Sequence, residues 1–310
     1  MSNPILFTRR RALSLLASGT LATLVRPEGW AQTVDLPAGI QLYMVKDDLA
    51  KDPAGTLRQL AAIGYREVET AGTGTLSAAN FRKLVDAAGL TVPSAHVGFG
   101  MGDTGKLLDD AKALGATYAV SSVLPPHSVS TTEGFAPVLK LLNTMSVDDF
   151  KRVAELANTV AAQAKAAGLQ YAYHNHNFEF RQLDNGQRGY DILLAATDPS
   201  LVRFEADCGW MKAAGVDPGT YFSRNPGRFA MIHVKDFKNL THPVTSLMSE
   251  DAPVSTELGT GSIDYGTIVA AARKAGIRHF FLEQEPPFAN MPAMKSAAVG
   301  YTALHKLLKA

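Results

Sequence analysis

The chain contains almost no cysteine. Cys208 is the only one among 310 residues, so no disulfide can form within the chain. It lies between Asp207 and Gly209, and we expect an inert buried thiol there, because free cysteines are usually buried. An excess of charge of one sign is also missing, since 30 basic residues face 29 acidic ones. This balance argues against a nucleic-acid partner.

Long apolar runs are missing as well. The stretch from Ala12 to Val25 is short and rich in Ser, Gly and Thr, which argues against a stable membrane span. It follows Thr8–Leu13 (TRRRAL), which resembles a twin-arginine export signal, and it precedes the small residues of Gly29–Ala31. We therefore predict that residues 1–31 are a signal peptide for the twin-arginine export machinery and that the mature protein is periplasmic or exported. An uncleaved anchor or a basic tail is the alternative.

A glycine-rich phosphate turn does not follow the first expected strand, where Lys46–Pro53 reads KDDLAKDP. Its absence disfavours a doubly wound open sheet. Eight strand–helix units fill residues 38–310 instead, and most of the helices end at a glycine. They predict a single (β/α)8 TIM barrel domain. The expected strands are 40–45, 67–70, 91–97, 118–123, 171–176, 202–206, 229–234 and 279–283, and the expected helices are 53–63, 78–88, 106–114, 147–167, 190–196, 217–224, 265–274 and 293–309.

Most of these strands stay apolar until a polar side chain appears near the carboxyl end. The clearest case is Tyr171–Phe180 (YAYHNHNFEF), and FEAD at Phe204–Asp207 repeats the pattern. In a parallel barrel the carboxyl ends of all strands meet at one mouth. The polar side chains collected there are Glu69, His96, His174, His176, Asp207, His233 and Glu283.

Imidazoles and carboxylates that converge on one small volume need a positive charge between them, because buried carboxylates repel each other. One divalent metal ion satisfies this requirement. Nitrogen and oxygen ligands are compatible with Mn2+, Co2+, Zn2+ or Fe2+, whereas imidazole disfavours Mg2+.

Three motifs, YHNHNFEF, HVKDF and ELGTGSIDY (Glu257–Tyr265), resemble the xylose-isomerase-like TIM barrels of the sugar phosphate isomerase/epimerase superfamily. The resemblance extends from Gly39 through the last expected helix. It implies a metal held after strands five to eight, by His174, Asp207, His233 and Glu283. His174 stands where the superfamily commonly has a glutamate, and His176 is the alternative ligand at this position.

The resemblance also implies catalytic roles. Two metal-bound glutamates of the superfamily move protons on opposite faces of an enediolate, and here an imidazole replaces one of them. Glu283 is therefore expected to work with His176 or Glu179 in proton transfer. Lys235 would polarise a carbonyl or stabilise an enolate, with a structural ion pair as its alternative.

Three further residues are expected to contact the substrate. Glu69 and His96 lie where sugar hydroxyls would bind, although either could instead orient a metal ligand. Trp210 could stack on a sugar ring, although packing in the core is the more common use of an aromatic side chain.

The predicted function is metal-dependent isomerisation or epimerisation of a sugar or polyol derivative. No basic cluster marks a phosphate site, so an unphosphorylated carbohydrate is favoured. The alternatives are a lyase, hydrolase or dehydratase acting on keto-sugars or 3-keto-glycosides, and a non-catalytic periplasmic sugar-binding barrel. Two long loops, 125–146 and 238–261, are expected to act as lids. The sequence leaves open whether the chain forms a homo-oligomer.

Overall fold

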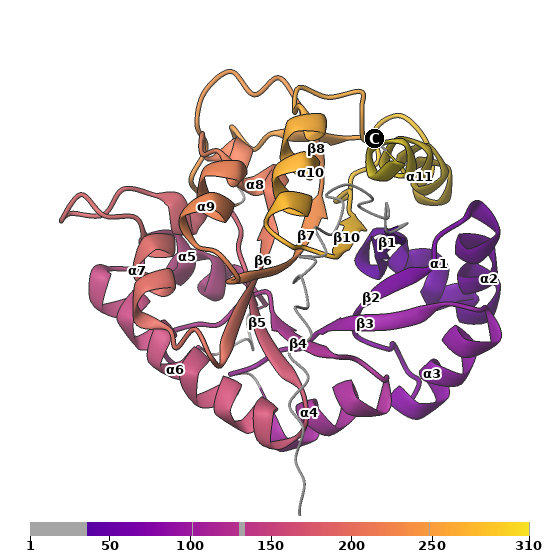
Figure 1. Ribbon diagram of the computed structural model, residues 1–310, viewed down its shortest axis with the longest axis horizontal. Helices are drawn as coiled ribbons and strands as arrows, with labels where there is room; N and C mark the ends of the chain where they lie inside the picture. Colours follow the sequence, from indigo (N-terminus) through magenta and orange to yellow (C-terminus); the bar gives the residue numbers. More distant parts are fainter. Residues whose placement is uncertain (1–35, 101, 130–133, 248, 310) are drawn as a thin grey trace, which may run out of the picture. The chain divides into compact units, whose positions relative to one another are not determined.

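The computed structural model describes residues 36–100, 102–129, 134–247 and 249–309. The predicted signal peptide, residues 1–31, lies outside the described residues. Eight parallel strands close into a barrel in the order β1-β10-β7-β6-β5-β4-β3-β2. Figure 1 shows the helices outside this ring of strands. The prediction of a (β/α)8 TIM barrel is therefore confirmed.

The elements follow the predicted alternation closely. The barrel strands are β1 (Ala38–Gln41), β2 (Glu67–Ala71), β3 (Thr91–His96), β4 (Tyr118–Ser121), β5 (Gln170–His174), β6 (Val202–Asp207), β7 (Phe229–Val234) and β10 (His279–Leu282). The helices are α1 (Lys46–Lys51), α2 (Pro53–Ile63), α3 (Ala78–Ala87), α4 (Thr104–Ala113), α5 (Ala136–Thr144), α6 (Val147–Ala166), α7 (Gly189–Ala196), α8 (Cys208–Ala213), α9 (Pro218–Arg224), α10 (Tyr265–Lys274) and α11 (Ala293–Lys309).

Several strands end earlier than their apolar runs predict, and two of these early ends affect the mouth of the barrel. β1 ends at Gln41, and Leu42–Val45 forms the 3-10 helix η1, because the Gln41 side chain accepts a hydrogen bond from the Tyr43 N–H at 3.1 Å. β5 ends at His174, so His176 lies beyond the strand, in the turn before the 3-10 helix η2 (Phe178–Phe180). The expected strand 171–176 thus ends two residues early, and strand alternation does not relate the side chains of His174 and His176.

Three expected connections contain secondary structure of their own. α5 lies inside the expected loop 125–146, and α8 follows β6 directly. The antiparallel pair β8 (Asp236–Lys238) and β9 (Val254–Thr256) lies within the connection between β7 and α10. These additions all follow carboxyl ends of strands, where the mouth of the barrel is built.

The inside of the barrel changes from apolar to charged along its axis. Val120, Ala172, Met231 and Phe281 form a separate buried apolar cluster. Two residues further along their strands stand His174 and His233, which point to the same side because side chains alternate along a strand. The charged site thus lies on an apolar layer. Among the described helices, none is long and apolar enough to cross a membrane.

Candidate active site

Asp207 stands at the end of β6 and is oriented by the helix that follows. Its Oδ1 accepts the backbone N–H of Trp210 at 2.9 Å and so caps α8. Its Oδ2 is buried and forms an ion pair with Lys235 Nζ at 2.9 Å. Gly209 permits this tight turn, because a Cβ there would lie 2.5 Å from the Lys235 carbonyl oxygen. One carboxylate oxygen is therefore used structurally and the other faces the site.

His233 connects two levels of carboxylates. It is paired in register with Asp207 across β6 and β7. Its Nδ1 lies 3.0 Å from Glu283 Oε2, and its Nε2 lies 2.6 Å from Glu69 Oε2. Although burial lowers the pKa of His233, Glu205, Glu69 and Glu283 outweigh it and hold this pKa well above its ordinary value. The imidazole thus has a carboxylate at each ring nitrogen.

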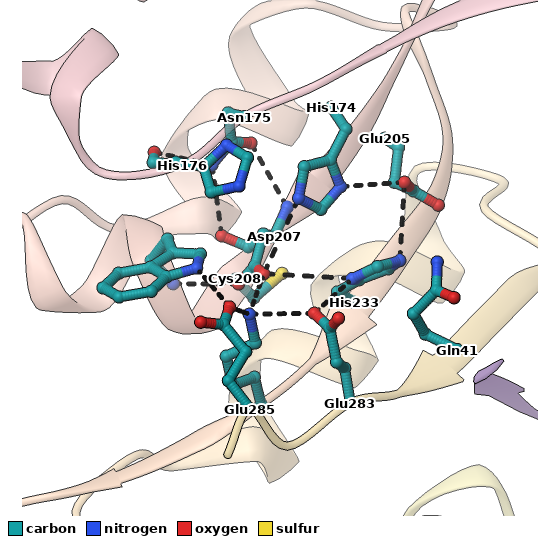
Figure 2. Close-up of polar contacts among 12 residues, drawn as sticks. Gln41, His174, Asn175, His176, Glu205, Asp207, Cys208, His233, Glu283 and Glu285 are labelled. Atoms are coloured by element: carbon teal, nitrogen blue, oxygen red, sulfur yellow. Dashed lines mark hydrogen bonds and ion pairs between the residues drawn. The ribbon is translucent and has the colours of Figure 1, made fainter. Parts of the chain in front are cut away.

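His174 has a similar arrangement on β5, which lies on the other side of β6 from β7. Its Nδ1 lies 2.8 Å from Glu205 Oε2, and its Nε2 faces Asp207 Oδ2 at 3.9 Å. Figure 2 shows Glu205 and Asp207 on opposite sides of this ring. Burial first, and the neighbouring imidazoles of His233 and His96 as well, lower the pKa of His174, so the ring is neutral.

The ammonium group of Lys235 lies between the carboxylates at the mouth. Its Nζ is 2.9 Å from Asp207 Oδ2 and 2.8 Å from Glu283 Oε2, and it also contacts Glu285. Burial lowers its pKa, but Asp207 and Glu283 raise it well above its ordinary value. The phenol oxygen of Tyr265 accepts the Lys235 N–H at 2.8 Å and donates to the Lys235 carbonyl at 2.6 Å.

A second level of charge lies deeper in the barrel. Glu205 Oε2 lies 2.7 Å from His96 Nε2, and this same nitrogen is 3.2 Å from Glu69 Oε2. Burial raises the pKa of Glu205, as does Glu69, but His233 and His96 outweigh both and hold it at about 2. Burial likewise lowers the pKa of His96, but Glu69 and Glu205 raise it to about 10.

Glu205 was not predicted from the sequence. Only Asp207 of the FEAD segment was selected, because it ends the strand. The spacing of the FEAD segment could have identified it, because residues two apart in a strand share a face. Glu205 therefore points into the barrel with Asp207.

Potential ligand atoms form two groups, in each of which all atoms lie within 4.8 Å of one another. One group consists of Asp207, His233 and Glu283, and the other of His96, His174, Glu205 and His233. The first holds three of the four predicted metal ligands. The fourth, His174, belongs to the other group, and its Nε2 lies 3.9 Å from Asp207 Oδ2.

A cavity of about 630 Å³ opens above this site. Gln41, His96, His174, His176, Glu283 and Glu285 are among the residues that line it. Neither lysine nor arginine occurs among the described residues of the lining. Asp207 and His233 are fully buried beneath it.

The side chains of Glu179 and Trp210 are turned away from this cavity. Glu179 is buried in the wall, where its oxygens accept the Tyr173 hydroxyl and the His176 N–H, each at 3.0 Å. Burial raises its pKa to about 8. Trp210 donates its Nε1–H to Glu285 at 3.1 Å and packs its ring against Phe237. Neither residue is among the described residues of the lining, so the proton transfer expected of Glu179 and the stacking expected of Trp210 stay predictions.

Glu69 also lies below the cavity rather than in its lining. Gln41 Nε2 donates to its Oε2 at 2.8 Å, and the Ser94 hydroxyl donates to its Oε1 at 2.5 Å. Burial raises its pKa, but the imidazoles of His96 and His233 outweigh burial and hold it well below the ordinary value. The alternative given for Glu69, that it orients a ligand, therefore agrees with its position. His96 does line the cavity, as predicted.

His176 lines the cavity beside His174, with ring centroids 5.1 Å apart. Its Nδ1 is buried without a hydrogen-bond partner among the described residues. Burial, and after it the charge of Lys235, lower its pKa to about 3, so it is a neutral base.

The ELGTGSIDY motif holds the end of β7 in place. The carboxylate of Asp236 accepts the backbone N–H groups of Gly259 and Gly261, each at 3.0 Å, and that of Ile263 at 3.2 Å. A Cβ at Gly261 would lie 2.1 Å from Asp236, so this close approach requires glycine. The motif therefore holds the segment after β7 in place next to the site.

A closed parallel barrel with imidazoles and carboxylates at the carboxyl ends of its strands defines a class: α/β-barrel proteins with a polar, cation-compatible mouth. The chain belongs to the xylose isomerase-like TIM barrel family, whose model matches residues 57–300.

Similar proteins are known within this fold. The chain is 25% identical over 191 residues to inosose dehydratase of Clostridium perfringens, covering 59% of this chain and 63% of that protein. It thus matches less than two thirds of this relative's length. A sugar phosphate isomerase/epimerase from Parabacteroides distasonis is 22% identical, with a TM-score of 0.70 and 89% and 96% of the two chains covered. The IOLI protein, solved with a zinc atom, is 14% identical, with a TM-score of 0.60 and 88% and 98% covered.

Proposed function

We propose that the protein is a metal-dependent enzyme that moves a proton next to a carbonyl group of an unphosphorylated sugar or polyol derivative, as an isomerase or epimerase. Its family contains sugar isomerases, epimerases and dehydratases, and this supports the reaction class. The single observation that carries the proposal is the convergence of Asp207, His233 and Glu283 beneath a polar cavity, with His174 beside them.

The donor set fits a divalent metal ion. Asp207 Oδ2 is a buried carboxylate oxygen paired with the ammonium of Lys235 at 2.9 Å, and the same ammonium lies 2.8 Å from Glu283 Oε2. A positive charge is therefore already favoured at this point. Asp207, Glu283, His233 Nδ1 and His174 Nε2 would hold Mn2+, Co2+, Zn2+ or Fe2+, the ions that accept mixed nitrogen and oxygen ligands. When bound, such an ion supplies Lewis acidity that acidifies the C–H group next to a carbonyl.

The chain's own residues provide the proton transfer. Glu283 lines the cavity and exposes part of its carboxylate, so it is placed to accept the proton. His176 lines the same cavity as a neutral imidazole and is the second proton carrier. The ammonium of Lys235 is buried among Asp207, Glu283 and Glu285, so the role expected for it at a developing oxyanion stays a prediction.

The substrate is expected to carry no phosphate. Phosphate recognition uses arginine, lysine or a helix N-terminus with free N–H groups. The described lining offers carboxylates, imidazoles and an amide instead, which suit hydroxyl groups.

The test is metal content together with turnover. Asp207→Asn keeps the Oδ1 that caps α8 but removes the charge, so it separates metal binding from folding. We expect about one metal ion per chain in the wild type and a loss in Asp207→Asn and His233→Ala. Active wild type should incorporate deuterium from D₂O into a ketose or polyol ketone. A wild type that stays metal-free after reconstitution would overturn the proposal and leave the non-catalytic sugar-binding barrel.

A dehydratase or related lyase is the second candidate. It is favoured by the similarity to inosose dehydratase and by the imidazole of His174 at a position where the resemblance implies a carboxylate. In this reaction the proton next to the ketone is removed and a β-hydroxyl group leaves as water. A product lighter by one water, instead of one of unchanged mass, distinguishes it from an isomerase. A 3-keto-glycoside would instead release its aglycone.

We further propose that the protein is exported through the twin-arginine machinery to the periplasm. The order of Arg9–Arg11, the apolar stretch and Ala31 supports this proposal. Replacing Arg9 and Arg10 by lysine should retain the protein in the cytoplasm, and unchanged export would contradict the proposal.

A further inference from the structure

The buried carboxylates of the site form two levels, and imidazoles lie between them. The upper pair is Asp207 and Glu283, and the lower pair is Glu69 and Glu205. Glu205 and Asp207 belong to the same strand and alternate with outward residues, which puts them one level apart. His174 and His233 each contact the lower pair with one ring nitrogen and face the upper pair with the other.

Glu205 is the centre of the lower level. Its Oε2 lies 2.8 Å from His174 Nδ1, 2.7 Å from His96 Nε2 and 3.4 Å from His233 Nε2. It is fully buried, and its pairing with His174 follows from the register of β5 and β6. A carboxylate in contact with a ring nitrogen accepts the N–H and so determines which nitrogen carries the proton.

We propose that Glu205 is a positioning residue that keeps the proton of His174 on Nδ1, so that the bare Nε2 is presented to a metal ion between Asp207 and Glu283. Glu69 accepts the Nε2–H of His233 in the same way, so a metal ion held by the upper pair would displace only the Nδ1 proton that Glu283 accepts. This inference rests on the proposed metal-dependent function. It adds the residues that orient the two imidazole ligands.

The distances favour hydrogen bonds over a second metal ion at the lower level. Ligand atoms that surround one Zn2+ at about 2.1 Å are separated by roughly 3.3 Å. Glu205 Oε2 lies only 2.7 and 2.8 Å from the nitrogens of His96 and His174, which are the separations of direct hydrogen bonds. A second ion at the lower level would also require His174 and His233 each to bind two metal ions, one through each ring nitrogen.

The opposite end of the barrel provides a matched control. Glu67 lies 2.9 Å from His279 Nδ1 and joins β2 to β10, so it is also a glutamate–histidine pair between strands. It stands at the starts of these strands, whereas the site stands at the ends. Glu67→Gln therefore removes the same kind of charge and changes no residue of the candidate site.

The first measurement is the tautomer of His174 in protein stripped by a chelator. Long-range 15N–1H NMR spectra distinguish a protonated from a bare ring nitrogen, and the His174→Gln variant assigns the signals. We expect the proton on Nδ1 of His174 and a change of this pattern in Glu205→Gln. A wild-type spectrum with the proton on Nε2 would overturn the inference. Because this result comes from the wild type, it stands even if a variant fails to fold.

The second measurement is a Zn2+ titration of the wild type, Glu205→Gln and Glu67→Gln. Loss of a carboxylate behind a ligating imidazole typically costs about 10–100-fold in metal affinity. We expect this loss in Glu205→Gln, its partial rescue in Glu205→Asp and no change in Glu67→Gln. Unchanged affinity in Glu205→Gln overturns the inference, as does binding of two ions by the wild type with one kept in Glu205→Gln. A wild type that binds no metal overturns the proposed function instead, and the tautomer measurement still decides the role of Glu205.

Discussion

Both ends of the barrel contain glutamate–histidine contacts between strands, but in different surroundings. At the amino end, Glu67 contacts His279 with both carboxylate oxygens, at 3.1 and 2.9 Å, and the His279 side chain is 22% exposed. At the carboxyl end, Glu205 is fully buried and contacts His174, which is also buried, and His96, which lines the cavity. Each pair joins strands that are distant in sequence.

The two ends differ in the number of charged groups that share a partner. The pair at the amino end is isolated and can exchange partners with water, so removing one member costs little. Every carboxylate at the carboxyl end shares its imidazole or ammonium partner with another carboxylate. Removing one member there leaves a buried charge without a partner, which is expensive. The comparison predicts effects that decrease from the mouth to the amino end.

The largest effect is expected for His233→Ala. This change removes an imidazole from between Glu69 and Glu283, and we expect a loss of about 3–5 kcal/mol in the free energy of unfolding. Metal affinity should fall by more than about 100-fold, since even partners of ligands cost about 10–100-fold. His279→Ala is the control, and chemical denaturation with metal titration measures both. Equal losses of stability in the two variants would refute the contrast between the ends.

Lys235→Met should have a large effect that depends on metal. The ammonium lies between Asp207 and Glu283, so its removal leaves two buried carboxylates facing each other. We expect the chelator-treated variant to lose about 3–5 kcal/mol in the free energy of unfolding. A divalent ion should restore most of this loss by taking the position of the ammonium, and thermal unfolding with and without Zn2+ checks it. If Zn2+ does not reduce this loss of stability, the metal ion and the Lys235 ammonium do not occupy the same position.

Glu179→Gln tests a buried carboxyl group outside the cavity. Burial raises the pKa of Glu179 to about 8, so the folded state holds a proton that the unfolded state releases above its ordinary pKa. Stability should therefore fall as pH rises through the range between these two pKa values. Glu179→Gln carries no titratable group and should remove about 4 kcal/mol of this decline. Urea unfolding at pH 5 and pH 8.5 measures it, and an identical decline in both proteins would contradict the raised pKa.

The smallest effect is expected for Glu67→Gln. The Glu67–His279 pair is partly exposed, and such pairs contribute about 0–1 kcal/mol. We expect a change in the free energy of unfolding within this range and turnover equal to that of the wild type. A loss above about 2 kcal/mol would show that the amino end is as tightly coupled as the mouth.

Much of this arrangement could be predicted from the sequence. The alternation of apolar runs with glycine-terminated helices is a local pattern, and it was sufficient for the barrel and for most element bounds. A polar residue at the end of an apolar strand is also a local signal, so Asp207, His233 and Glu283 were assigned to one site. The short 3-10 helix η1 was missed because Leu42–Val45 is as apolar as a strand, and only the Gln41 side chain ends β1.

The local pattern did not indicate which way each side chain turns. Glu179 and Trp210 follow the same strands as the predicted ligands, yet they bond within the wall and to Glu285. The short helices η2 and α8, which follow β5 and β6, place these side chains, and the orientation of such short helices depends on contacts that no periodicity records.

The sequence by itself thus determined the barrel and the residue types at its mouth, because periodicity and strand ends are properties of neighbouring residues. The closed sheet decided the two levels of carboxylates, the partner of each imidazole nitrogen and the place of the Lys235 ammonium. These depend on register, including the shift between Phe204 and Glu205 opposite β7, which brings Glu205 beside Met231 and Asp207 beside His233. Such a shift arises only when strands far apart in the chain are paired around the ring.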